Sequence, residues 1–311
     1  MFAAAMILGL AIDLALGWPD ALFRRIGHPV TWIGRLIAAL EARWNRGGRW
    51  RRRSAGLACA LLVIAAAVLP AALLAAALPG GWAGALLTGV LAWPLIAARS
   101  LHDHVAAVAA PLARGDLAGA RVAVARIVGR DPAMLDAAGV ARAAIESLAE
   151  NASDGVAAPL FWGALLGLPG IAGYKAVNTL DSMIGHRNAR YEDFGKAAAR
   201  IDDLANLIPA RLTGLLFALV SRRPRPSLAA VRRDARLHRS PNAGWPEAAM
   251  AGGLGIRLSG PRVYGDRRVE EPWVNGAARD PEPADIRAAL ALAARGLAAG
   301  AALLAITALW L

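Results

Sequence analysis

The densest group of polar side chains in the sequence lies between Lys175 and Asn188. These fourteen residues include amine, amide, hydroxyl, carboxylate, imidazole and guanidinium groups. On a helix, Asn178 and Asp181 are neighbours at i, i+3, and Gly185 lets the chain turn after them, so His186 would lie at the helix end. A helix cap with ordinary surface charge explains any one of these residues, but the group together predicts a functional site.

A second group consists of the acids Glu146, Glu150 and Asp154, which are spaced i, i+4 and i+8. On one α-helix they would share a face. A solvated acidic face is the ordinary interpretation of such spacing. Here the face runs directly into an apolar segment, where carboxylates are costly unless cations or a metal pair with them. The spacing therefore predicts ligation of Mg²⁺ by carboxylate oxygens.

Oxygen ligands also precede the next apolar run, at Asp202, Asp203 and Asn206. Asp202 and Asn206 are i, i+4 neighbours, whereas Asp203 and Asn206 are i, i+3 neighbours. Helix N-capping explains one aspartate. Arg211 lies within the apolar run itself, which predicts that it pairs with a buried acid or holds a phosphate.

Several chemistries are excluded by what the sequence lacks. It contains no G-x-x-x-x-G-K-[ST], HExxH or GxSxG pattern, so an ordinary P-loop is excluded. Cys59 is the only cysteine, which excludes a disulfide within the chain, a zinc cluster and an iron–sulfur cluster. The turn Ser240–Glu247, which contains Asn242, is explained by loop structure on chemistry alone.

The elements that position these residues are predicted to be membrane helices. Hydrophobic residues make up 57% of the 311 residues, and no charged residue occurs in the 45 residues from Ser54 to Ala98. As a helix this stretch would be about 68 Å long, against about 30 Å for the hydrocarbon core, so it predicts two crossings. Six apolar segments are expected: Phe2–Leu22, Ala55–Leu78, Trp82–Ala98, Gly155–Tyr174, Leu204–Ser221 and Ala288–Leu311.

The expected fold is therefore an all-α polytopic membrane protein with about four to six membrane segments, some of them re-entrant. We expect one integral-membrane domain over residues 1–311, with a cytoplasmic helical region at 99–154. Residues 222–287 are rich in Arg, Pro and Gly, which predicts a soluble, loop-rich region.

The charge balance is strongly basic, with 35 basic and 23 acidic residues and a net charge of +12. Anionic lipid or phosphorylated substrates are the partners that this predicts. Nucleic acid is disfavoured, because the Arg clusters flank apolar spans. Six arginines between Arg43 and Arg53 place that loop in the cytoplasm by the positive-inside rule.

The order and spacing of the motifs resemble the integral-membrane adenosylcobinamide-phosphate synthase family of cobalamin biosynthesis (CbiB/CobD). The likeness begins at Asp13 and is densest over Glu146–Arg211. The motifs that carry it elsewhere are Gly17–Pro19, His28–Val30, Ile33–Gly34, Ser240–Glu247 and Gly260–Gly265.

The resemblance implies formation of an amide. The propionate carboxylate of adenosylcobyric acid would be joined to (R)-1-amino-2-propanol O-phosphate, or to free aminopropanol, to give adenosylcobinamide phosphate. ATP as cosubstrate and Mg²⁺ are implied. A carboxylate is a poor electrophile and must first become an acyl phosphate or an adenylate, and metal and Arg stabilise the transferring phosphoryl group.

We infer the residue roles ourselves within this implied reaction. The candidate catalytic residues are Glu146, Glu150, Asp181, His186 and Asp203, with His186 taking a proton from the attacking ammonium. The candidate substrate-binding residues are His28, Asn151, Lys175, Asn178, Ser182, Arg187, Asn206, Arg211 and Asn242. The candidate metal ligands are Asp154 and Asp202.

Two other functions stay open: a membrane carrier for a corrinoid or another anionic ligand, served by charges within apolar segments, and a non-catalytic membrane sensor of the same fold. The enzyme is favoured because the polar blocks flank the apolar segments. Product formation by the purified protein with ATP would distinguish it from both alternatives. A multi-pass protein of the inner membrane is expected, with a complex with other cobalamin-assembly enzymes as a further expectation.

Topology poses a conflict for the enzyme. If every segment spans and the Arg43–Arg53 loop is cytoplasmic, residues 175–203 fall outside the cell, where ATP is not available. We therefore expect the fourth and fifth segments to be re-entrant or buried half-spans. Residues 146–154, 175–203 and 240–247 are then expected to meet on the cytoplasmic side.

Overall fold

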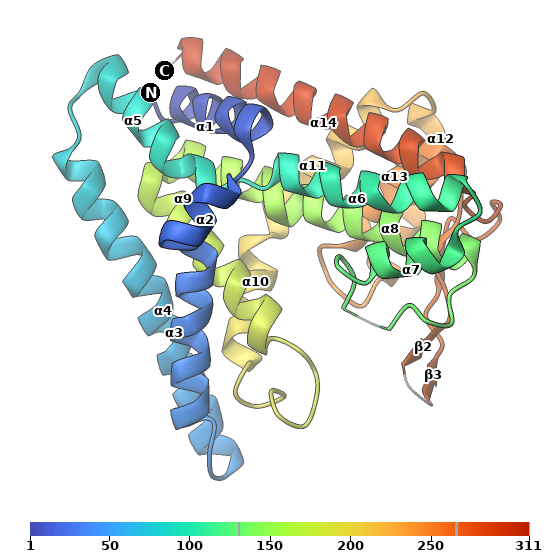
Figure 1. Cartoon of the computed structure of the whole chain (residues 1–311), viewed down its shortest axis with the longest axis horizontal. Helices are drawn as coiled ribbons and strands as arrows, with labels where there is room; N and C mark the ends of the chain where they lie inside the picture. The colour runs from blue at the N-terminus through green and yellow to red at the C-terminus, as the bar shows by residue number, and fades with distance from the viewer. Residues whose placement is uncertain (130, 265–266, 311) are drawn as a thin grey trace. The chain divides into compact units, whose positions relative to one another are not determined.

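Helices dominate the computed structural model, which describes residues 1–129, 131–264 and 267–310 (Figure 1). Strands within these residues are only two or three residues long. The chain divides into two compact units. The first unit comprises residues 1–97, 158–206 and 303–311, and the second comprises residues 98–157 and 207–302. The predicted all-α class is confirmed.

The first unit is built from long helices. Its helices are α1 (Phe2–Leu16), α2 (Asp20–Ile26), α3 (Pro29–Trp44), α4 (Arg49–Ala77), α5 (Gly81–Ala92), the short 3-10 helix Trp93–Leu95, α9 (Ala158–Ile184) and α10 (Lys196–Ala205). Ile37 of α3, Val63 of α4 and Leu180 of α9 form a buried core together with Phe194 from the loop after α9.

Three glycines break the helices of this unit. Gly17, Gly27 and Gly167 all have φ between 60° and 72° with ψ near −152°, a conformation that side chains with a Cβ rarely adopt. The axes change direction by 108° between α1 and the α2–α3 pair. Within α9, the break at Gly167 places the carbonyl of Trp162 against Gly170, so the fourth apolar segment is sharply bent rather than a straight span.

The second unit contains shorter helices and the strands. Its helices are α6 (Ala98–Ala113), α7 (Leu117–Val124), α8 (Ala137–Asn151), the π-helix Ala152–Ala157, α11 (Leu207–Val220), α12 (Pro224–Asp234), the 3-10 helix Ala235–Leu237, α13 (Gly244–Leu254) and most of α14 (Pro283–Trp310). Antiparallel pairs form between β1 (Leu258–Ser259) and β4 (Trp273–Val274), and between β2 (Arg262–Tyr264) and β3 (Arg267–Val269).

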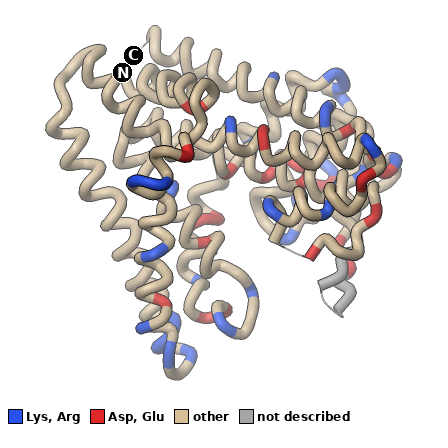
Figure 2. Tube along the Cα trace, viewed as in Figure 1, with Lys and Arg blue, Asp and Glu red and all other residues tan. Residues whose placement is uncertain are grey.

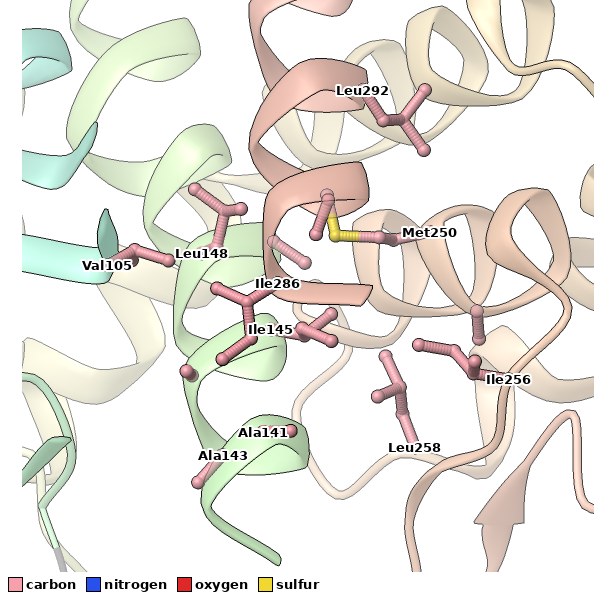
Figure 3. Packing of buried hydrophobic residues seen from close by; sticks show 14 of the residues in the cluster. Val105, Ala141, Ala143, Ile145, Leu148, Met250, Ile256, Leu258, Ile286 and Leu292 are labelled. Atoms are coloured by element: carbon pink, nitrogen blue, oxygen red, sulfur yellow. The ribbon is translucent and has the colours of Figure 1, made fainter. Parts of the chain in front are cut away.

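The core of the second unit is centred on α8 and α13. Ile145, Met250, Leu258 and Ile286 are fully buried there (Figure 3). Residues 222–287, expected to be loop-rich, contain loops and the short strands together with α12 and α13. These two helices pack tightly, because Gly252 approaches the Pro226 carbonyl so closely that a Cβ would lie 2.7 Å away.

Four helical stretches are long and apolar enough to cross a membrane, and two bent pairs raise the number to six. The four are Arg49–Ala77, Gly81–Ala113, Ala137–Ile184 and Pro283–Trp310. The bent pairs are α1 with α2–α3, and α10 with α11, which is bent by 46°. This agrees with the predicted polytopic membrane fold. The expected sixth segment extended to Leu311, which lies outside the described residues.

Candidate functional site

The junction of α9 and α10 gathers the ionisable groups of the first unit. The negative charges of Asp181 and Asp203 repel each other, whereas a positive charge on His186 attracts the Asp181 carboxylate. Arg187 and Arg200 act on Asp203 as favourable charges, and the Arg200 guanidinium lies 3.8 Å from its carboxylate. We call these five residues the junction cluster. Asp181 and Asp203 are both half-buried, whereas the three cationic or basic residues are exposed.

The end of α9 fixes the position of Asp181. The helix ends at Ile184, and the Gly185 N–H donates to the Asp181 carbonyl at 2.7 Å. A Cβ at position 185 would lie 2.0 Å from Oδ1 of Asp181, so only glycine leaves room for the carboxylate there. The sequence predicted this turn and the place of His186 after it. The Ser182 hydroxyl donates to the Asn178 carbonyl within the helix.

The loop after α9 is held against α3 and α4. Arg190 donates two hydrogen bonds to the Glu41 carboxylate, at 2.9 and 2.7 Å, and this pairing raises the pKa of Arg190. Arg53 donates to Asp193 at 2.8 Å, while Arg52 donates to the Ala189 carbonyl at 3.1 Å.

These contacts bear on the topological conflict. The loop that contains His186 lies beside the Arg43–Arg53 segment. The break at Gly167 agrees with the expectation that the fourth apolar segment is not a straight span.

A buried hydrogen-bonded chain lies behind the junction cluster. The Tyr174 hydroxyl donates to Oδ1 of Asn206 at 2.8 Å, and the Asn206 amide donates to Oδ2 of Asp202 at 3.0 Å. All three side chains are buried. Asp202 and Asn206 thus share a helix face as their spacing predicted, but this face is internal, whereas Asp203 on the neighbouring face is half-buried. Tyr174 was not among the predicted site residues.

His28 and Lys175 are brought close together in the first unit. His28 is the N-cap of α3, and its Nδ1 accepts a hydrogen bond from the Val30 N–H at 3.2 Å. Its ring makes an edge-to-face contact with Trp18, with the ring centroids 5.0 Å apart. The two residues interact electrostatically. Lys175 is only 8% exposed, so this amine is an interior group.

The second unit holds a buried polar network that the sequence did not reveal. The Ser259 N–H donates to Oε1 of Glu146 at 2.6 Å, and its hydroxyl donates to Glu247 at 3.4 Å. Nε2 of His238 lies 3.6 Å from the Glu247 carboxylate. Glu146 and Glu247 therefore converge on Ser259, whose φ is +58°. A signal was available, because Glu247 is the lone acid in the otherwise apolar stretch 243–254.

The predicted acidic face of Glu146, Glu150 and Asp154 is not continuous. Glu146 is buried and Glu150 is exposed, while Asp154 lies in the π-helix Ala152–Ala157. In the described part of the chain no three His, Cys, Asp or Glu side chains form a metal-binding group. The Asn151 amide donates to the Ser147 carbonyl of its own helix at 2.9 Å.

Arg211 secures the turn that precedes α13. Its guanidinium donates to the Leu207 carbonyl at 2.6 Å and to Oδ1 of Asn242 at 3.2 Å, and it stacks 4.6 Å from the Trp245 ring centroid. These acceptors are neutral oxygens rather than the buried acid that was one alternative. The positive charge of Arg236 repels the guanidinium of Arg211.

Comparison with known proteins identifies the family. A family model described as CobD/Cbib protein matches residues 6–293. The chain belongs to the CobD/CbiB family. No solved structure matches it.

Curated relatives of this CobD/CbiB chain align over nearly its full length. One from Rhodobacter capsulatus, named cobalamin biosynthesis protein CobD, is 66% identical over 297 residues, which cover 96% of this chain and 94% of the relative. Relatives of the same name from Brucella anthropi and Sinorhizobium fredii are each 48% identical, over 303 and 312 residues. They cover 92% and 96% of this chain, and 90% and 95% of their own lengths.

The predicted site residues of this CobD/CbiB protein are shared between the two units. Ten lie in the first unit: His28, Lys175, Asn178, Asp181, Ser182, His186, Arg187, Asp202, Asp203 and Asn206. Six lie in the second: Glu146, Glu150, Asn151, Asp154, Arg211 and Asn242. The expectation that 175–203 meets the other two blocks stays a prediction. Of the family motifs, Gly260–Gly265 ends at a residue outside the described part of the chain.

The implied Mg²⁺ would find two carboxylates, those of Asp181 and Asp203, in the junction cluster. Mg²⁺ commonly uses one or two carboxylates together with water and substrate phosphates. Asp181 and Asp203 provide two half-buried carboxylates whose mutual repulsion a divalent cation would relieve. Asp202, in contrast, is buried with its Oδ2 accepting from Asn206.

Proposed function

We propose that this protein acts in cobalamin biosynthesis as an amide-forming ligase of the inner membrane. It would join the propionate carboxylate of adenosylcobyric acid to the amine of (R)-1-amino-2-propanol O-phosphate, or of free aminopropanol, with consumption of ATP. The observation that carries the proposal is the junction cluster: two repelling carboxylates, an imidazole and two guanidinium groups at the end of α9. The names of the relatives support the pathway.

The reaction requires the protein to hold a metal ion, to bind phosphate oxygens and to take a proton from the amine. ATP supplies the group that turns the carboxylate into an acyl phosphate or adenylate, and Mg²⁺ neutralises charge on the phosphates. Asp181 and Asp203 would hold the metal. Arg187 and Arg200 would bind phosphate oxygens as charge-assisted donors.

The attacking amine must lose a proton, because an ammonium group has no lone pair. His186 is exposed beside the carboxylates, and a neutral imidazole accepts a proton near physiological pH. After the amine attacks the activated carbonyl, the phosphate or AMP leaves and the amide remains. Lys175, which is buried, and His28, which is half-buried, would contact an anionic part of the substrate.

The position of the loop after α9 supports a cytoplasmic site. It contacts the arginine-rich segment through Arg52 and Arg53, and such segments remain in the cytoplasm. ATP is available on that side.

The test is product formation by purified protein. Detergent-solubilised wild type, D203N and E192Q are incubated with adenosylcobyric acid, aminopropanol phosphate, Mg²⁺ and ATP, and adenosylcobinamide phosphate is quantified by chromatography. Glu192 is an exposed acid of the loop between α9 and α10, and it serves as the control for removal of a charge near Asp203. We expect ATP-dependent product, a loss of about 10²-fold or more in D203N and near wild-type rates in E192Q.

Absence of product from well-folded wild-type protein would refute the ligase. Retention of corrinoid binding in that case would favour the carrier. Equal rates in D203N and wild type would instead move the chemistry away from the junction cluster.

A further inference from the structure

An arginine-rich surface lies where α3 ends and α4 begins. Residues 41–53 and 187–193, which pack together there, contain eight arginines and three acids. Figure 2 shows the basic positions gathered at this end of α3 and α4. The proposed reaction uses Arg187 alone of these eight, so the remaining charge needs another explanation.

Two of the acids are already neutralised within the protein. The Glu41 carboxylate accepts two hydrogen bonds from Arg190. Asp193 lies 2.8 Å from Arg53 and 3.5 Å from Arg49. The positive charge of the other arginines is therefore in excess at this surface.

Those other arginines have neutral partners or face outward. Arg46 donates to the Ala42 carbonyl at 2.9 Å, and Arg52 donates to Oδ1 of Asn45 at 2.9 Å. The side chain of Arg51 folds back over Gly47. Arg43, Arg46 and Arg51 are exposed. We call Arg43, Arg46, Arg51 and Arg52 the arginine collar.

A small cavity opens beside the arginine collar. Its volume is about 280 Å³, and its walls are Glu41, Ala42, Asn45, Arg52, Ala189 and Arg190. Since Arg190 neutralises Glu41, the lining keeps the positive charge of Arg52, whose hydrogen-bond acceptors are the neutral oxygens of Asn45, Ala189 and Arg190.

The exposed apolar surface of α4 shows that lipid extends to the height of the arginine collar. The uncharged part of α4 begins at Ser54, and only 22% of its most apolar window is buried. Leu57, Leu61, Leu69 and Leu73 are exposed along it, which requires a hydrocarbon environment. At about 1.5 Å per residue, Arg51 lies within about 5 Å of Ser54 along the axis.

The headgroups must therefore lie beside the arginine collar. Trp50 is 75% exposed at this level, and tryptophan is enriched at membrane–water interfaces.

We propose that the arginine collar binds the phosphodiester headgroup of an anionic phospholipid of the surrounding bilayer. Each arginine near a membrane surface contributes about 1 kcal/mol, or roughly fivefold in affinity. The three exposed members together should contribute roughly a hundredfold. This site is separate from the proposed amide-forming chemistry.

The test compares lipids by their effect on thermal unfolding in a nonionic detergent. Phosphatidylglycerol is added to wild type at concentrations where phosphatidylcholine has little effect, and we expect a clear rise in the unfolding midpoint with the anionic lipid alone. R43Q/R46Q/R51Q should lose most of this rise, whereas R43K/R46K/R51K should keep most of it. A matched triple of exposed arginines from the second unit, R222Q/R225Q/R232Q, should respond like wild type.

Three outcomes would overturn the proposal: equal shifts with both lipids, a full shift in the glutamine triple, or the same shift from inorganic phosphate without lipid that the glutamine triple loses. The last would assign the collar to a soluble phosphate. If the glutamine triple does not fold, wild type still decides, because 1 M salt shortens the screening length to about 3 Å and should abolish the difference between the lipids.

Discussion

Two pairs of acidic side chains, one pair in each unit, are held in different ways. In the second unit, Glu146 and Glu247 are buried and accept hydrogen bonds from Ser259, so their lone pairs are used inside the fold. In the first unit, Asp181 and Asp203 are half-buried and repel each other. The first pair is therefore satisfied by the fold, whereas the second pair keeps carboxylate oxygens at a partly exposed position where a cationic ligand could reach them.

The largest expected effect concerns activity in the first unit. Asp181→Asn and Asp203→Asn should each lower turnover by about 10²-fold or more, or roughly 3 kcal/mol. Their thermal midpoints should equal or exceed that of wild type, because one of two repelling charges is removed. Chromatographic rates and detergent melting curves measure the two effects. A fall in midpoint with unchanged turnover would show that these acids are structural.

The next effect concerns stability in the second unit. Glu247→Ala leaves the Ser259 hydroxyl and His238 without this carboxylate and should cost about 2–3 kcal/mol of unfolding free energy. The exposed Glu150→Ala in the same unit should change stability by no more than about 0.5 kcal/mol. Scanning fluorimetry gives both midpoints. The comparison between the units would fail if Glu247→Ala melted like wild type.

A substitution of Arg211 tests whether a cation of the second unit stabilises the fold or binds the substrate. Arg211→Lys keeps the charge but loses the guanidinium hydrogen bonds to Leu207 and Asn242 and the flat stacking on Trp245, and we expect a loss of about 1 kcal/mol in stability. If Arg211 acts only on structure, KM for aminopropanol phosphate measured on the folded fraction stays constant. A large rise in this KM at unchanged stability would instead place Arg211 at the substrate phosphate.

The smallest expected effect is a pH dependence at the surface of the second unit. Arg257 donates two hydrogen bonds to Asp280, and Arg142 adds favourable charge, so the pKa of Asp280 lies below its ordinary value. A lowered folded-state pKa stabilises the protein above the unfolded-state value of about 3.9. That stability is lost as pH falls through the folded-state pKa.

The size of this contribution is limited by exposure, since the Asp280 side chain is 41% exposed. We expect less than about 1 kcal/mol. Wild type should lose its advantage over D280N when melting curves are compared from pH 6 down to pH 3. An advantage that persists unchanged at pH 3 would contradict an ionic origin.

Sequence spacing predicted the local features of the site correctly where a helix is regular. Asn178 and Asp181 share a helix that ends at Ile184, and Asp202 and Asn206 are bonded at i, i+4. The predicted acidic face is broken by burial, because Glu146 is buried in the core of the second unit whereas Glu150 is exposed. The network of His238, Glu247 and Ser259 was missed because its members come together only through packing.

The sequence by itself determined the membrane class, the helical fold and the family. These follow from long uncharged runs, a basic charge balance and motifs in a fixed order, all of which are linear properties of the chain. Only the tertiary structure decided that the loop after α9 lies against the arginine-rich segment Arg43–Arg53. That depends on the bend at Gly167 and on contacts from Arg52 and Arg190 to partners more than a hundred residues away. Helix bends and long-range hydrogen bonds depend on three-dimensional packing, which no periodicity in the sequence encodes.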